Sequence, residues 1–185
     1  MRWDALFDDL AAQGTALEQA ELAAEVAERT RGETGRIGLV DRTRAAVGLE
    51  LQILVRGAPA LTGRLARAGA DWLLLDEPDR RETLIASAQV VSVRGLGRAA
   101  AVPGSAGVVE SRIGFRQVLR AVARDRSRVR IHLADGSVRA ATIDRVGADF
   151  VDVAIQLPAA PRRSAELCGS ELLVIAAISA VRRSV

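Results

Sequence analysis

The chain contains no lysine, asparagine or tyrosine, and only one cysteine and one histidine among its 185 residues. Because Cys168 is the only thiol, an internal disulfide and a zinc site built from paired cysteines are both excluded. His132 has no second histidine with which to share a metal, and we interpret it as a surface residue. The sequence therefore predicts neither a metal site nor a cofactor.

Signatures of the common enzyme classes are also missing. The sequence has no Gly-rich phosphate loop and no Ser-His-Asp spacing, and no pair of carboxylates stands out by its surroundings. We therefore expect no catalytic residues and no small-molecule substrate. The protein is predicted to be non-enzymatic.

Long apolar runs are absent. No run reaches the roughly 18 residues of a membrane span, and the N-terminus carries Asp4, Asp8 and Asp9 where a signal peptide has its apolar centre. We expect no membrane association and a cytoplasmic location. The hydrophobic fraction of 49% instead indicates a well-filled core.

Charge is unevenly distributed, although the net charge is only +3. The first 30 residues are rich in Asp and Glu, whereas 112–130 holds seven Arg residues and one Asp. Arg112, Arg116, Arg120 and Arg124 recur every four residues and form one stripe on a predicted helix. The stripe is a phosphate-binding face, a dock for the acidic N-terminal helix, or plain solvated surface. The combination of an acidic N-terminal segment and a basic middle segment predicts self-association or a polyanionic partner.

A short motif occurs twice and reveals an internal duplication. The stretch 67–72, Arg-Ala-Gly-Ala-Asp-Trp, matches 145–150, Arg-Val-Gly-Ala-Asp-Phe. The likeness continues in both directions, with Arg-Ile-Gly before a helix and alternating apolar residues after it. Each copy is predicted to form a helix, three strands, a loop and two strands.

The duplication sets the predicted domain boundaries. An acidic helical segment covers 1–35, with its helix over 3–30 and a break near 31–36. The first unit covers 36–97, an Ala-, Gly-, Pro- and Ser-rich linker covers 98–110, and the second unit covers 111–185. A helix is expected from 36 to about 47, and 76–82 is expected to be a polar loop.

Three short motifs resemble the Sm-like (Lsm) family. Residues 133–138, Leu-Ala-Asp-Gly-Ser-Val, resemble its first hairpin, with Asp-Gly as a two-residue turn. Residues 93–95, Val-Arg-Gly, resemble the end of its second motif. Gly63 and Ala141, each two residues before an aliphatic, are similar to the point where the second Sm strand bends. A small side chain permits the sharp curvature that closes a small barrel.

The resemblance covers about 36–95 and 112–183. It implies an α+β fold, mainly β, with an N-terminal helix and two tandem helix-preceded five-stranded Sm-like small barrels. The whole chain is also similar to a group of actinobacterial proteins, which implies no particular activity. Sm proteins satisfy their open strand edges by forming rings. Here the two barrels either contribute to a ring of several chains or cap each other within a monomer.

The resemblance also supplies candidate RNA-binding residues. In Sm rings the arginine of the second motif lines the pore and contacts RNA, and Arg94 with Gly95 matches it. Arg182 with Arg183 matches it in the second copy, which lacks the glycine. The competing interpretation is that each arginine is solvated or paired with a neighbouring acid at the end of a strand.

The duplicated Asp and the aromatic after it have two interpretations each. The Sm family usually places an asparagine near this point to hold a base, and Asp71 and Asp149 occupy roughly that place. The alternative is a turn in which each Asp accepts hydrogen bonds from nearby backbone N–H groups. Trp72 and Phe150 would stack on a base if exposed, but the adjoining aliphatic residues favour a role in the core.

Two functions therefore remain open. The favoured one is a non-enzymatic assembly or interaction protein, with a homo-oligomer or another protein as partner. The alternative is binding of RNA or other single-stranded nucleic acid through Arg at strand ends and on the second helix.

Overall fold

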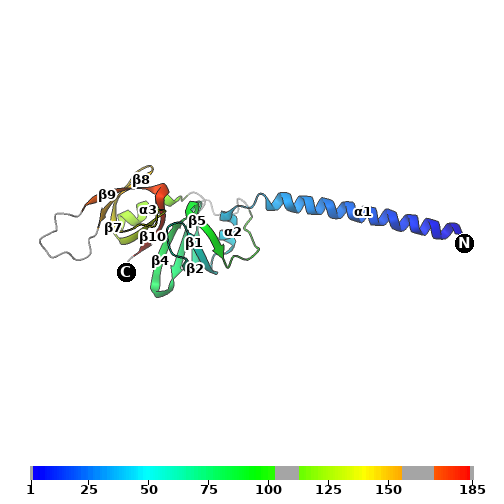
Figure 1. The fold of residues 1–185 in the computed structure, drawn as a ribbon, viewed down its shortest axis with the longest axis horizontal. Coiled ribbons are helices and arrows are strands. Elements are labelled where there is room, and N and C mark those ends of the chain that lie inside the picture. Colours follow the sequence, from blue (N-terminus) through cyan, green and yellow to red (C-terminus); the bar gives the residue numbers. More distant parts are fainter. Residues whose placement is uncertain (1, 103–112, 156–168, 184–185) are drawn as a thin grey trace. The chain divides into compact units, whose positions relative to one another are not determined.

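The computed structural model describes residues 2–102, 113–155 and 169–183. The fold in these ranges is α+β and mainly β, with three α-helices and one antiparallel sheet (Figure 1). The chain divides into two compact bodies, Met1–Gly38 and Leu39–Val185. Residues 103–110 of the predicted linker lie outside the described residues, and so does Cys168.

The N-terminal body consists mainly of helix α1, Arg2–Thr34. Ala and Glu, which are strong helix formers, dominate its sequence. The helix continues through Gly14 and ends in a turn in which Gly35 N donates to Arg31 O at 3.0 Å. It is therefore longer than the predicted 3–30, and the expected break begins at Gly35. No helix in the described ranges is long and apolar enough to cross a membrane.

The C-terminal body contains both copies of the duplicated plan, in the predicted order. The first copy comprises α2 (Leu39–Ala45), β1 (Glu50–Val55), β2 (Leu61–Ala68), β3 (Trp72–Glu77), η1 (Pro78–Arg80), β4 (Arg81–Ala86), η2 (Ser87–Gln89) and β5 (Val90–Arg94). The second comprises α3 (Phe115–Arg124), β6 (Arg128–Leu133), β7 (Val138–Val146), β8 (Phe150–Ile155), β9 (Ser170–Val174), η4 (Ile175–Ala177) and β10 (Ile178–Arg183).

One ten-stranded antiparallel sheet joins the two copies. Its strand order is β5-β1-β2-β3-β4-β10-β6-β7-β8-β9. Each copy contributes five neighbouring strands, and the last strand of each pairs with its own first strand. The copies meet where β4 pairs with β10, an interface that we call the internal junction. The sheet is open, and β5 and β9 form its two edges.

Two local predictions were wrong. The segment 76–82 is mostly strand, because Asp76 pairs with Glu82 and Glu77 with Arg81, leaving only η1 as the connection. Polar side chains at the end of a hairpin remain solvated while the backbone completes its ladder, so their polarity did not indicate a loop. The helix expected from 36 to about 47 is confined to α2.

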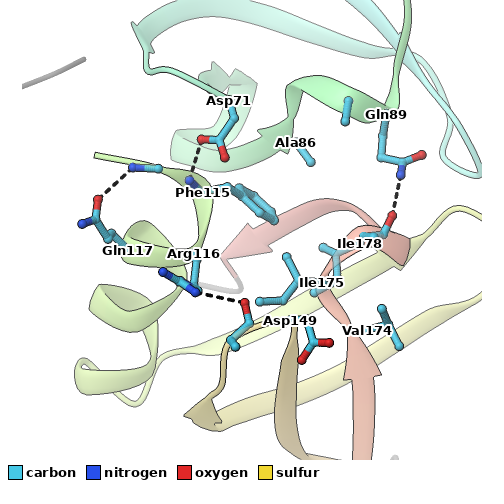
Figure 2. A pocket seen from close by; sticks show the side chains of 14 residues that line it. Asp71, Ala86, Gln89, Phe115, Arg116, Gln117, Asp149, Val174, Ile175 and Ile178 are labelled. Carbon is cyan, nitrogen blue, oxygen red and sulfur yellow. Dashed lines mark hydrogen bonds between the residues drawn. The ribbon is translucent and has the colours of Figure 1, made fainter. Parts of the chain in front are cut away.

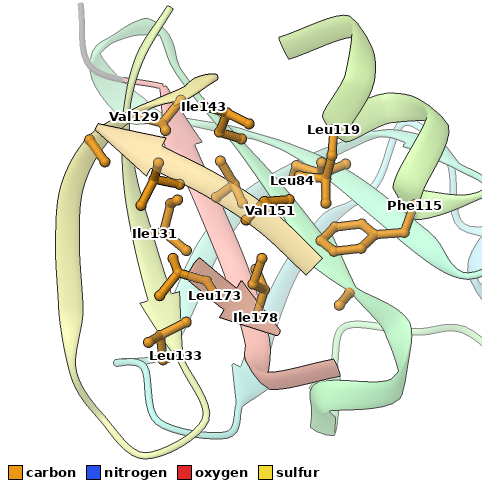
Figure 3. Close-up of a cluster of buried hydrophobic side chains, with 14 of the residues drawn as sticks. Leu84, Phe115, Leu119, Val129, Ile131, Leu133, Ile143, Val151, Leu173 and Ile178 are labelled. Carbon is orange, nitrogen blue, oxygen red and sulfur yellow. The ribbon is translucent and has the colours of Figure 1, made fainter. Parts of the chain in front are cut away.

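The hydrophobic core extends across the internal junction. Alternating side chains of β1 are buried, as expected for a strand with one face in the core. Trp72, Leu84 and Ala86 of the first copy pack in the same cluster as the buried residues of the second copy. Figure 3 shows Leu84 beside Phe115 and Leu119 of α3. The two copies therefore share a core.

Gly63, one of the two predicted bend residues, lies where β2 and β3 approach closely. A Cβ atom on Gly63 would lie 2.2 Å from Asp76 O, so only glycine fits there. The ladder between β2 and β3 shifts register between Leu65 and Arg67, and the ladder between β7 and β8 shifts at the matching place. Both long strands are therefore irregular just after the predicted small residue.

Candidate functional site

The internal junction contains an ion pair formed by one of the predicted arginines. Arg182 Nη2 lies 2.7 Å from Glu77 Oε2 and 2.9 Å from Glu77 Oε1. The Arg182 Nε group also donates to Thr83 Oγ1 at 3.3 Å. The side chains of Arg182 and Glu77 are only 19% and 11% exposed. In this chain Arg182 connects β10 to β3 and β4.

Asp71 also contributes to the junction. Its Oδ1 accepts a hydrogen bond of 2.6 Å from the backbone N–H of Phe115, the first residue of α3 (Figure 2). The predicted turn between β2 and β3 is present, but the carboxylate bonds to the backbone of the other copy and not to nearby backbone N–H groups. The first turn of a helix has N–H groups without intrahelical partners, and Asp71 satisfies one of them from the other copy.

Two further hydrogen bonds cross between the copies on the same side of the molecule. Trp72 Nε1 donates to Ile113 O at 2.8 Å. Gln89 Nε2 donates to Ala176 O at 2.6 Å (Figure 2). Trp72 is buried, which confirms its predicted place in the core. The second copy of the duplicated plan therefore supplies the hydrogen-bond acceptor that the N–H of a buried tryptophan usually finds.

A pocket of about 560 Å³ lies along this seam. It is lined by the start of α3, by Asp71 and Asp149, and by residues of η2 and η4 (Figure 2). Arg116 Nη1 donates to Ala148 O at 3.1 Å. The Asp149 carboxylate has no hydrogen bond or ion pair to the described residues.

The chemistry of this pocket is limited. The N-terminus of α3 is already occupied by Asp71 and by Gln117, whose Oε1 accepts from Gly114 N at 2.8 Å. A negatively charged ligand would therefore find a carboxylate where a helix N-terminus otherwise attracts anions. Among the described residues, no three His, Cys, Asp or Glu side chains are grouped to hold a metal ion.

The remaining candidate arginines lie in separate environments. Arg183 Nη2 pairs with Asp125 Oδ2 at 2.8 Å. Arg94 is exposed on the edge strand β5, and its Nη1 lies 3.4 Å from Gln52 Oε1. Gly95 follows β5 with a φ of 91°. Arg120 and Arg124 border a shallow groove beside Arg145 and have no hydrogen bond or ion pair to the described residues.

His132 differs from the prediction. It is a residue of β6 and lies opposite Ala180 of β10. Its side chain is buried rather than on the surface. Within the described part of the chain, neither ring nitrogen has a hydrogen-bond partner. Burial lowers the pKa of His132, and the nearby charges of Arg182 and Arg130 lower it further. The sequence pattern correctly placed it on the face opposite Ile131, but the junction covers that face.

The outer edges carry apolar side chains that sequence reasoning missed. Val91 on β5 and Leu172 on β9 are 59% and 56% exposed. Leu84, which occupies the place of Leu172 in the first copy, is 4% exposed. The sequence signal for this correspondence is the pair of aliphatic residues shared by the two copies, Leu84-Ile85 and Leu172-Leu173.

No protein-family model, curated protein or solved structure matches this chain. The function must therefore be inferred from the chain's own geometry.

Proposed function

We propose that this protein is a non-enzymatic assembly protein in which separate chains join head to tail through the edges of their sheets. In this proposal each copy of the duplicated plan is an Sm-like unit. The internal junction is the observation that carries the proposal, because the chain already joins one unit to the next by pairing β4 with β10. The strands left at the edges, β9 and β5, are the equivalents of that same pair.

The strand order supports this equivalence. The first unit reads β5-β1-β2-β3-β4 across the sheet, and the second reads β10-β6-β7-β8-β9. Strand β9 therefore corresponds to β4, and β5 corresponds to β10. A second chain that places its β5 against β9 would repeat the geometry of the internal junction. Edge strands have unpaired N–H and C=O groups that favour such pairing.

Burial supports it as well. Leu84 becomes buried at the internal junction, whereas the equivalent Leu172 is exposed at the outer edge. Ser179 on β10 is fully buried, whereas the equivalent Val91 on β5 is exposed. The outer edges therefore present apolar surface at places that the chain covers internally. Burying it would stabilise the contact by about 25 cal/mol per Å² of apolar area.

The symmetry of the proposed contact limits the products. The two edges differ, so the contact is heterologous and yields a closed ring or an open filament. The resemblance to the Sm family favours a ring. Each chain would then contribute two units to it.

Light scattering after gel filtration tests the proposal over a range of protein concentrations. We expect the full chain to form a species larger than one chain, and Leu172→Glu to shift it to a monomer because the charge would be buried in the contact. Leu22→Glu is the matched control, since Leu22 is also exposed but lies on helix α1, outside the sheet. A wild-type monomer at all concentrations, or equal effects of both variants, would overturn the proposal.

Binding of RNA or other single-stranded nucleic acid remains the second candidate, favoured by Arg120 and Arg124. Their guanidinium groups have no partner among the described residues and lie one helical turn apart on α3. Binding through phosphates would weaken steeply with salt. Titration of labelled single-stranded RNA at two salt concentrations, with the Arg120→Ala/Arg124→Ala double variant, tests this. No binding at low salt would exclude it.

A further inference from the structure

The registers of the two units identify equivalent positions on the edge strands. Arg94 lies opposite Gln52 in the first unit, and Arg182 lies opposite Arg130 at the same place in the second. Thr83 lies opposite Leu75, and Glu171 lies opposite Val153 at the same place. Arg94 is therefore the equivalent of Arg182, and Glu171 is the equivalent of Thr83.

At the internal junction, the two positions occupied by Arg182 and Thr83 lie directly opposite each other. Arg182 is the register partner of Thr83, and its guanidinium also pairs with Glu77 on the neighbouring strand β3. In the second unit the residue equivalent to Glu77 is Ile155, which lacks a charge. The acid of the second unit is instead Glu171, on the edge strand itself.

We infer that Arg94 of one protein chain pairs with Glu171 of the next chain, and that this pair makes the assembly directional. The inference rests on the proposed function, because it specifies the contact between β5 and β9. Pairing β5 with β9 in the internal register places Arg94 opposite Glu171. Pairing two β5 strands or two β9 strands in that register would instead bring like charges to this position, which is unfavourable.

The present partners of both residues are compatible with the new pair. Arg139 Nε lies 2.7 Å from Glu171 Oε2, and Arg139 Nη2 lies 3.2 Å from Glu171 Oε1. A carboxylate has about four lone-pair sites, so Glu171 can accept from Arg94 while it keeps Arg139. Among the described residues, Arg94 has only the long contact with Gln52 to give up.

Arg139 also orients the acid. It holds Glu171 on the face of the sheet that carries Arg139, and the two side chains are only 32% and 36% exposed. Because the Glu171 side chain is already oriented, forming the new pair costs less side-chain entropy in total than ordering two mobile side chains would.

Charge reversal tests this inference with the full-length chain. Arg94→Glu places Glu opposite Glu171 at every contact between copies, and Glu171→Arg places Arg94 opposite Arg. We expect each variant alone to assemble at least about tenfold more weakly than the wild type, because like charges would face each other in the contact. An equimolar mixture should recover assembly, because each contact then joins Glu to Arg. The double variant should recover it as well.

Matched controls separate this inference from the proposed function. Arg67→Glu reverses the charge of an exposed arginine on the inner strand β2 and should leave assembly unchanged. If the wild type assembles and Leu172→Glu disrupts it, but the charge-reversed variants assemble normally, edge pairing stands and the Arg94–Glu171 pair is wrong. Loss of assembly that neither mixing nor the double variant restores would also overturn the pair. If the wild type does not assemble, both proposals fail.

Discussion

Asp71 and Asp149 occupy equivalent places in the two units, yet of their two carboxylates only that of Asp71 has a hydrogen-bond partner among the described residues. Its carboxylate accepts the N–H of Phe115 at 2.6 Å and thereby caps α3. Replacing Asp71 by Ala leaves this N–H without its acceptor and removes a negative charge from the start of the helix. Loss of a side-chain cap costs about 1 kcal/mol, within a range of roughly 0.5–2 kcal/mol.

We therefore expect Asp71→Ala to lower the free energy of unfolding by about 1 kcal/mol, because Asp71 is exposed and water competes for the freed N–H. For a chain of this size, that corresponds to a fall in Tm of about 2–4 °C. Asp71→Asn keeps an acceptor oxygen and loses only the charge, so its effect should be smaller. Asp149→Ala removes the equivalent carboxylate and should change stability by less than about 0.5 kcal/mol.

Urea denaturation followed by the fluorescence of Trp72 measures these differences, in a Trp3→Phe background that removes the other tryptophan. Trp72 reports the same seam, since its indole donates to Ile113 O. Protein concentrations at which every variant is monomeric keep assembly out of the measurement. Equal losses for Asp71→Ala and Asp149→Ala, or no loss for Asp71→Ala, would refute the assignment of Asp71 as the cap of α3.

Two further predictions concern packing and pH. Gly63→Ala should destabilise the protein by about 1–3 kcal/mol, because its Cβ would meet Asp76 O at 2.2 Å. Ala141→Gly at the equivalent position should cost only about 0.5–1 kcal/mol. Chemical denaturation that finds Ala141→Gly the more destabilising of the two would contradict this prediction. For His132, the lowered pKa means that the unfolded chain binds a proton near the ordinary value of 6.5 while the folded chain does not. Stability should therefore fall as the pH drops below about 6.5. His132→Phe should reduce this dependence, and parallel pH profiles from urea unfolding would show that His132 is not its source.

The sequence by itself determined the duplication and most of the strands. Periodicity of two predicted β1 and β6, and the repeated Gly-Ala-Asp located the turn before β3 and β8. These features are local, because the alternation of buried side chains and the turn chemistry depend on neighbours in the chain. The core position of Trp72 followed from the adjoining aliphatic residues for the same reason.

Only the tertiary structure decided which side chains meet across the junction. Pairing of β4 with β10 buries His132, aligns Arg182 with Thr83 and directs Asp71 to the start of α3. These contacts join residues far apart in the sequence, and no local pattern records the register between two strands of different units. Equivalent residues such as Leu84 and Leu172 consequently differ in burial although their local sequences predict the same strand. Their place in the sheet, at its centre or at its edge, makes the difference.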